Sequence, residues 1–187
     1  MAFGVNKNTE IGGDFLTIKN ADDAIKEGVK VISITHEIGQ YGTQMKVVVS
    51  CQGAEVTQWY SAPSEELAAK KPKRTMEVQN TAVESLLKSI GICFDPNFAF
   101  ENVETFEEAV DELVKQTKDK WATIELRAKF VYNKKGYISL PYHPKFLENS
   151  SIARKDTKLA VDPKFDIIVP PVVNRAVDSE DPFADTF

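Results

Sequence analysis

The stretch from Val29 to Tyr60 constrains the fold most, because three short runs of β-branched and aromatic residues are separated there by glycine-containing turns. Gly39-Gln40-Tyr41-Gly42 and Gln52-Gly53 contain residue types that adopt the positive φ of hairpin turns. In the second run apolar and polar residues alternate, which is the period of a half-buried strand. The apolar positions are Met45, Val47, Val49 and Cys51, and the polar ones are Gln44, Lys46 and Ser50. The sequence therefore predicts a meander of three antiparallel strands.

The first run of this meander changes phase at Val31 and Ile32, which are both apolar. Such a change is typical of a β-bulge, which bends a strand around a small barrel. We therefore expect a bent first strand.

Two helices are predicted between residues 80 and 117. They follow residues 61–79, which carry prolines and no apolar period and so predict an exposed loop. Thr81 to Glu84 and Thr105 to Glu108 have the spacing of capping boxes, and apolar residues follow at helical spacing. Gly91 is placed to end the first helix.

The later part of the chain contributes two more predicted strands. Residues 121–132 alternate strictly between a core face and a face that we expect to be wet and basic, residues 133–136 make a turn, and residues 137–142 form the fifth strand. Prolines then recur, which predicts an extended linker at 148–173 and a disordered acidic tail at 174–187. Residues 1–28 are expected to form an N-terminal arm beside the first strand.

The expected fold is mainly β, with five strands, a two-helix insertion (80–117) between strands 3 and 4, and a flexible C-terminal tail. This number and order of strands resembles the OB-fold, a five-stranded, partly open barrel that binds oligonucleotides or oligosaccharides. The resemblance places an OB-like barrel at 29–147. Other short β-barrels share the pattern and stay open as alternatives.

Composition places the chain among soluble globular proteins. Its 187 residues, 42% hydrophobic and 27% charged, suit one domain with a tail. No apolar run approaches the roughly 20 residues of a membrane span, and the N-terminus has no signal-peptide pattern. We therefore expect no membrane partner and a cytoplasmic location. Cys51 and Cys93 are isolated in the sequence, which favours free thiols over a disulfide or a zinc site.

The net charge of −5 is unevenly distributed along the chain. Residues 29–74 hold six basic and four acidic side chains, and residues 118–147 hold seven and two. Residues 77–117 hold two basic and nine acidic side chains. A basic surface for a polyanionic ligand is therefore compatible with the acidic protein as a whole.

No motif in the sequence indicates a catalytic site. Glycine-rich phosphate loops, a nucleophile elbow and metal-binding helix patterns are absent. The acidic residues of 101–112 fall on the outer side of a predicted helix, which favours a solvated face over a metal site, and His36 reads as a structural histidine. We expect a protein that is not an enzyme and needs no cofactor and no metal.

Aromatic residues interleaved with basic ones give the strongest functional signal. Proteins hold single-stranded nucleic acid by stacking bases on aromatic rings while Lys and Arg neutralise phosphates. A lone tryptophan at a strand end is more often a core edge, and a basic hairpin is often only a soluble turn, so the prediction depends on the combination. The predicted binding residues are Lys46, Trp59, Lys70, Lys71, Lys73, Arg74, Trp121, Arg127, Lys129, Lys134, Lys135 and Tyr137.

The last ten residues, Asp178-Ser-Glu-Asp-Pro-Phe-Ala-Asp-Thr-Phe187, hold four acidic residues and no basic one. In this motif and in its strand order the chain resembles the single-stranded DNA-binding proteins of tailed bacteriophages and, more distantly, of bacteria. The resemblance implies a barrel that coats single-stranded DNA without strong sequence preference in the host cytoplasm. It also implies a tail that recruits replication or recombination proteins, with Asp181, Pro182, Phe183 and Phe187 as the contact residues.

Two other classes of function fit parts of the sequence. One is a non-catalytic adaptor or virion component whose OB-like barrel meets an acidic partner. The other is a nuclease or annealing enzyme, which needs a metal cluster or an ATP site that the sequence does not show. Barrels of this kind work as monomers or as homo-oligomers, so the sequence leaves the oligomeric state open.

Overall fold

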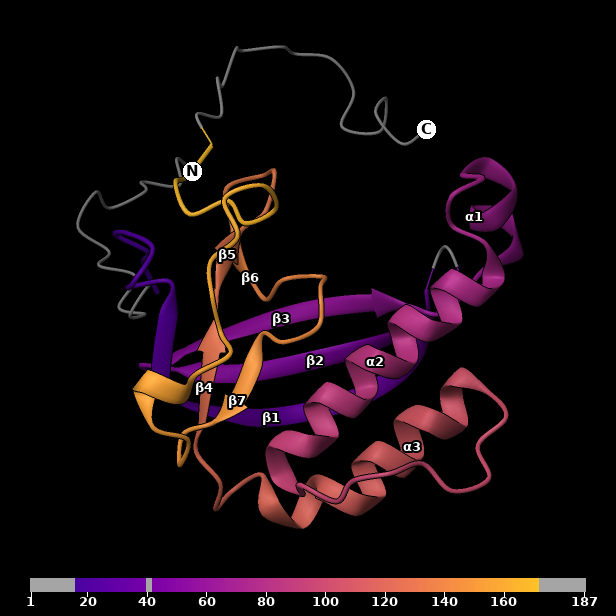
Figure 1. Ribbon diagram of the computed structural model, residues 1–187, viewed down its shortest axis with the longest axis horizontal. Coiled ribbons are helices and arrows are strands. Elements are labelled where there is room, and N and C mark those ends of the chain that lie inside the picture. Colours follow the sequence, from indigo (N-terminus) through magenta and orange to yellow (C-terminus); the bar gives the residue numbers. More distant parts are fainter. Residues whose placement is uncertain (1–15, 40–41, 172–187) are drawn as a thin grey trace, which may run out of the picture.

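The computed structural model describes residues 16–39 and 42–171 of the chain. A five-stranded antiparallel sheet of order β3-β2-β1-β4-β7 lies at its centre, and β5 and β6 form a separate two-stranded sheet (Figure 1). The strands are β1 (Ile25–Gly39), β2 (Gly42–Cys51), β3 (Ala54–Ser61), β4 (Leu126–Lys129), β5 (Val131–Tyr132), β6 (Ile138–Ser139) and β7 (Leu147–Asn149). The helices are α1 (Glu65–Lys70), α2 (Met76–Phe94) and α3 (Phe106–Thr117), with the 3-10 turns η1 (Lys118–Lys120) and η2 (Arg154–Asp156).

The prediction of a mainly β fold is confirmed as an antiparallel five-stranded sheet with few helices. The strands of the described ranges do not close into a barrel, since β3 and β7 are the two edges of the sheet. A helical insertion lies between β3 and β4 as predicted, but in the described residues it holds three α-helices from Glu65 to Thr117 instead of two within 80–117.

The predicted meander is confirmed by β1, β2 and β3. Gly39 pairs with Gly42 across the first hairpin. In the second turn Gln52 and Gly53 have φ values of 51° and 83°, the pair of positive angles that a two-residue turn needs to match the twist of its strands. The apolar face of β2 is fully buried, as its alternation predicts.

The predicted bend in β1 is also confirmed. The register against β2 shifts between Val31 and Ser33, which leaves the Ile32 side chain 49% exposed. A second irregularity against β4 lies between Lys26 and Val29, where Gly28 has a φ of 69° that favours glycine. The start of β1 consequently lies at a steep angle to the rest of the strand (Figure 1), and the one strand pairs with β4 first and with β2 afterwards.

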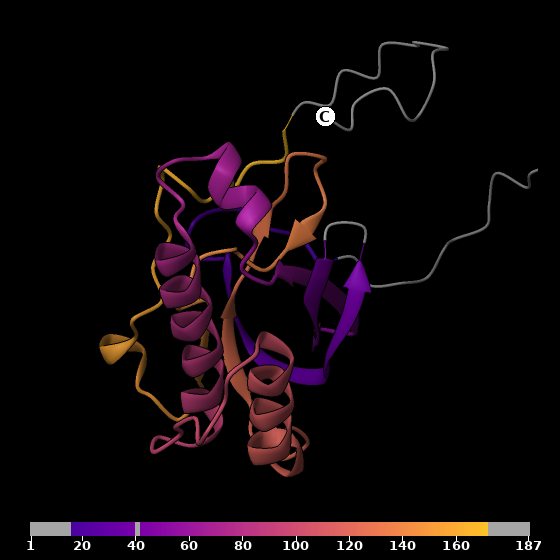
Figure 2. The same cartoon turned by 90° about the vertical axis from the view of Figure 1, so that its right-hand side faces the viewer.

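Helices α2 and α3 lie side by side against one face of the sheet (Figure 2). The predicted cap at Thr81 is wrong, because Thr75 caps α2 by accepting a hydrogen bond from the Val78 N–H at 3.3 Å. The predicted exposed loop at 61–79 is therefore partly helical, with α1 and the first turn of α2 within it. The capping box at Thr105 and Glu108 is confirmed by both of its hydrogen bonds.

Gly91 does not end α2, which continues to Phe94. A Cβ atom at Gly91 would lie 2.3 Å from a ring carbon of Phe98. The glycine therefore lets an aromatic ring pack directly on the helix backbone, and packing rather than termination explains its place in the sequence.

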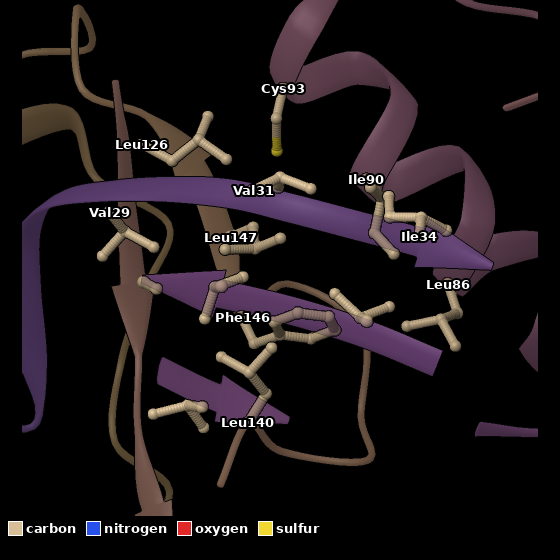
Figure 3. Packing of buried hydrophobic residues seen from close by; sticks show 14 of the residues in the cluster. Val29, Val31, Ile34, Leu86, Ile90, Cys93, Leu126, Leu140, Phe146 and Leu147 are labelled. Carbon is tan, nitrogen blue, oxygen red and sulfur yellow. The ribbon is translucent and has the colours of Figure 1, made fainter. Parts of the chain in front are cut away.

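The core lies between the sheet and α2 (Figure 3). Val31 and Ile34 of β1 face Ile90 of α2, and the Cys93 side chain points toward the sheet beside them. The cluster continues to the other strands and the loop before β7 through Leu126, Leu140, Phe146 and Leu147. Cys51 and Cys93 are both buried free thiols, as predicted.

The predicted strand at 121–132 is wrong in its first part. Residues 121–125 form turns after α3, with the Trp121 N–H donating to the Lys118 carbonyl at 3.4 Å, and β4 begins only at Leu126. The strand breaks at Phe130, whose N–H donates to the Ala24 carbonyl at 2.8 Å instead. The predicted fifth strand at 137–142 is reduced to β6, which within the described residues pairs with β5 and not with the central sheet.

Residues 148–171, predicted as a linker, are part of the folded structure. β7 pairs with β4 at the edge of the sheet. The chain that follows buries Leu159 and Asp166, and the Ile167 carbonyl accepts a hydrogen bond from the Tyr132 N–H at 2.7 Å. The predicted tail, 174–187, and most of the predicted N-terminal arm lie outside the described residues.

Candidate nucleic-acid interface

Lys46 and Trp59 lie opposite each other on β2 and β3, on the face of the sheet that points away from the core. The Lys46 Nζ atom is 5.0 Å from the centre of the Trp59 ring. This cation–π contact stabilises both side chains by itself, so the pair has a structural role as well. Because Trp59 is only half-buried, part of its ring stays open to a ligand.

The hairpin between β5 and β6 presents Lys134, Lys135 and Tyr137 to solvent, as the sequence predicts. Asn133 shapes the turn, since its side-chain oxygen accepts hydrogen bonds from the N–H groups of Lys135 (2.9 Å) and Tyr137 (3.0 Å). The Tyr137 side chain is 69% exposed. The fixed turn therefore holds two cations and one aromatic ring on a single protruding element.

A cavity of about 440 Å³ lies at the base of this hairpin. Lys134 and Lys135 line it together with Tyr142, His143 and Phe165. Tyr142 and Phe165 are 70% and 65% exposed, and the rings of His143 and Phe165 are 5.2 Å apart. Exposed aromatic side chains gathered around a cavity with cations mark a ligand site more often than a core edge.

Sequence reasoning missed Tyr142, His143 and Phe165. Tyr142 was assigned to a strand and Phe165 to the extended linker, so neither counted as a surface aromatic. The available signal was Pro141 and Pro144, which flank Tyr142 and His143 and mark that stretch as a loop.

Tyr60 fixes the position of Tyr142. Its buried hydroxyl donates a hydrogen bond to the Pro141 carbonyl at 2.9 Å, and the two tyrosine rings meet edge to face at 6.3 Å. Burial raises the pKa of Tyr60 well above its usual range, and the neighbouring Tyr142 adds to the effect, so the Tyr60 hydroxyl stays a donor. The exposed Tyr142 ring thus packs against a buried core residue that fixes its position.

Arg74 reaches the same region from the segment between α1 and α2. It lines a second cavity, of about 270 Å³, whose wall includes Tyr60 and Tyr142. Lys71, Lys73 and Arg74 are exposed, and the described part of the chain forms no ion pair with them. Lys70 instead pairs with Glu66 at 2.6 Å. Tyr142 therefore borders two cavities, one with Lys134 and Lys135 and one with Arg74.

Trp121 lines neither of these two cavities. It is 7% exposed, belongs to the core cluster, and its Nε1 donates a hydrogen bond to Thr117 Oγ1 at 3.0 Å. The placement of Trp121 on a wet face is therefore wrong, because the turn after α3 directs the ring inward.

Arg127 and Lys129, also predicted on that wet face, are buried under the chain that follows β7. The Arg127 guanidinium donates to Glu27 and Glu148, both at 2.6 Å. Lys129 Nζ donates to the Asp166 carboxylate at 2.6 Å and to the Ala160 carbonyl at 2.9 Å. Burial acts to lower the pKa of Arg127, and its hydrogen bonds to the two glutamates outweigh this and raise it. Both cations are therefore paired inside the protein, where they hold the C-terminal part of the fold in place.

His36 has an acidic neighbour in the structure. His36 Nε2 lies 3.2 Å from Asp111 Oδ1, a partner that the sequence spacing did not reveal. No group of three or more His, Cys, Asp or Glu side chains within residues 16–39 and 42–171 could hold a metal ion. No helix in those same ranges has the length and apolar character needed to cross a bilayer. The tail residues Asp181, Pro182, Phe183 and Phe187 lie outside the described residues.

Comparison of the chain with protein-family models, with curated proteins and with solved structures finds no match in any of the three.

Proposed function

We propose that the protein binds single-stranded DNA without strong sequence preference and does so without catalysing a reaction. The observation that carries the proposal is the position of Tyr142, a 70% exposed ring between one cavity with Lys134 and Lys135 and another with Arg74. Aromatic rings offer every base a stacking face, and flanking cations neutralise phosphates, which gives affinity without sequence readout.

The strand path also supports the proposal. The OB-like order predicted from the sequence has three strands, a helical insertion and two further strands in a partly open barrel. Here β1 pairs with both β2 and β4, and the helices come between β3 and β4. We propose that β1 to β6 form an open variant of such a barrel, with Lys46 and Trp59 as a second contact for DNA on the outer face of the sheet.

We propose that the acidic tail, with Phe183 and Phe187, recruits replication or recombination proteins. The acidic residues and the phenylalanines in the sequence of 174–187 support this role.

The direct test is a fluorescence anisotropy titration of labelled oligo-dT over a range of salt concentrations, with wild type and the Tyr142→Ala variant. Binding to wild type should weaken steeply as salt rises, and the variant should bind more weakly at every salt concentration. The Ile92→Ala variant, which truncates an exposed α2 side chain away from this surface, serves as the control. An adaptor that meets an acidic protein partner would show no appreciable binding to oligo-dT even at low salt, and that result would reject the proposal.

A further inference from the structure

A third cavity, of about 660 Å³, lies between α2, the start of α3 and the end of the meander. None of its lining residues is among those assigned above to nucleic acid, although it adjoins the cavity of Arg74. Its volume falls within the range of about 300 to 1,000 Å³ that is typical of ligand pockets.

The groove arises because α2 is longer than α3. The N-terminal turns of α2 extend beyond α3 on the side of α1, so part of the apolar stripe of α2 has no helix against it (Figures 1 and 2). The apolar lining comes mainly from Met76, Val83, Leu87, Phe100, Val103 and Phe106. Val103 lines the groove without belonging to the hydrophobic core or to the residues packed against it.

The charged residues of the lining are all acidic. Glu84, Glu104 and Glu107 line the groove, and no Lys or Arg does so. Glu107 Oε1 accepts a hydrogen bond from Thr43 Oγ1 at 2.5 Å, and this bond is the main reason that its pKa is lowered. An acidic charge is thus held at the edge of an apolar floor.

This charge pattern excludes nucleic acid and other anions from the groove. The first turn of α3 carries the carboxylates of Glu107 and Glu108, and Thr105 already accepts a hydrogen bond from the Glu108 N–H, so this helix start disfavours a phosphate. The groove adjoins the cavity that contains Arg74, with which it shares Ala62, Pro63 and Val83, but the charge changes sign between the two. Opposite charge on neighbouring surfaces selects different partners for each.

We infer that the groove between α2 and α3 docks a basic peptide segment of a partner protein, with apolar side chains on the floor and Lys or Arg side chains against Glu84, Glu104 and Glu107. Charge complementarity assigns the occupant, since an apolar floor alone would accept any hydrophobic segment. The inference is independent of DNA binding, because it uses none of the residues assigned to that activity.

The test uses the full chain and a fluorescein-labelled peptide of about 15 residues with Leu at helical spacing and Lys elsewhere. A peptide with Glu in place of each Lys, and one with Ser in place of each Leu, are the comparison probes. We expect the Leu–Lys peptide to bind roughly tenfold more tightly than either comparison peptide. Only this peptide offers both Leu side chains to the apolar floor and Lys side chains to the three glutamates. Equal binding of the acidic peptide would overturn the charge assignment.

Variants of the protein locate the binding. The double variant Glu84→Lys/Glu104→Lys should lose most of the affinity for the Leu–Lys peptide, whereas Glu55→Lys/Asp119→Lys makes the same change in net charge away from the groove and should lose little. Val103→Asp should weaken binding, whereas Val78→Asp, on an exposed part of α2, should not. Circular dichroism spectra that match wild type establish that each variant is folded. Binding that survives both groove variants would overturn the proposal, and so would self-association of the free protein that both of them abolish, because a second copy would then fill the groove.

Discussion

The Nη1 atom of Arg127 lies 2.6 Å from Oε1 of Glu148, with both side chains almost completely shielded from solvent. Removing the guanidinium leaves a buried carboxylate without its counter-charge. We expect Arg127→Met to lower the free energy of unfolding by about 3 to 5 kcal/mol, the usual cost of breaking a buried pair on one side. Urea denaturation gives the value directly.

Arg154→Met is the matched control for Arg127. Arg154 also donates to Glu27, at 3.1 Å, but its side chain is 69% exposed. Water screens such a pair, so the loss should be no more than about 1 kcal/mol. Similar losses in the two variants would show that burial of the Arg127 pair does not matter for stability.

The two tryptophans should respond differently to substitution. Trp59→Ala should weaken oligo-dT binding by about 1 to 3 kcal/mol while the fold is kept, since its half-buried ring lies on the outer side of the sheet. Trp121→Ala should instead lower the free energy of unfolding by about 3 to 5 kcal/mol, because its ring belongs to the core. Anisotropy of a labelled oligonucleotide and urea denaturation measure the two effects separately. If the Trp121→Ala protein were folded and bound oligo-dT more weakly, Trp121 would belong to the DNA-binding surface.

Deletion of residues 174–187 should leave oligo-dT affinity unchanged or slightly tighter. The acidic segment carries like charge to the phosphates and so competes with them for the basic surface. The measurement is a comparison of dissociation constants at low salt, where the competition is strongest. Loss of DNA binding on deletion would contradict the assignment of DNA binding to the folded part of the chain.

Stability should fall in acid. The pKa of Glu107 is lowered chiefly by the hydrogen bond from Thr43, and that of Asp95 chiefly by the backbone N–H of Asn97. A carboxyl group with a lowered pKa in the folded state stabilises the protein fully above its unfolded value, 4.5 for Glu and 3.8 for Asp. That contribution is lost as the pH falls through the folded pKa. Urea midpoints at neutral pH and below these values give the change, and Thr43→Val should make it smaller.

Gly91→Ala should destabilise the protein although alanine favours helices. Alanine gains about 1 kcal/mol of helix propensity, but the new Cβ overlaps the Phe98 ring, and overpacking costs about 1 to 3 kcal/mol. The same substitution made in a Phe98→Ala background should be neutral or stabilising. A double-mutant cycle by urea denaturation tests this, and a destabilising effect of equal size in both backgrounds would remove Phe98 as the cause.

Local signals in the sequence predicted the parts of the fold that local interactions determine. The bulge at Ile32, the turn at Gln52 and Gly53, and the cap at Thr105 depend on residues within a few positions of each other. Such features follow from alternation and from turn or cap chemistry.

The errors concern residues whose environment is set by distant parts of the chain. Alternation placed Arg127 and Lys129 correctly opposite Leu126 and Ala128, but it does not say what covers a face. The covering segment lies beyond residue 147, where polar composition and prolines predicted a linker. Its carboxylates, Glu148 and Asp166, meet the two cations only in the folded structure. The exposed aromatics Tyr142 and Phe165 were missed for the same reason, since exposure is a tertiary property.

The cover that residues 148–166 place on β4 sets an order of events during synthesis of the protein. Until the ribosome has added Asp166, Lys129 has no buried counter-charge, and until it has added Glu148, Arg127 lacks one as well. A chain truncated between these positions would display a charged strand beside an unfinished sheet edge. The buried charges of β4 are thus fully paired only after Asp166 has been synthesised.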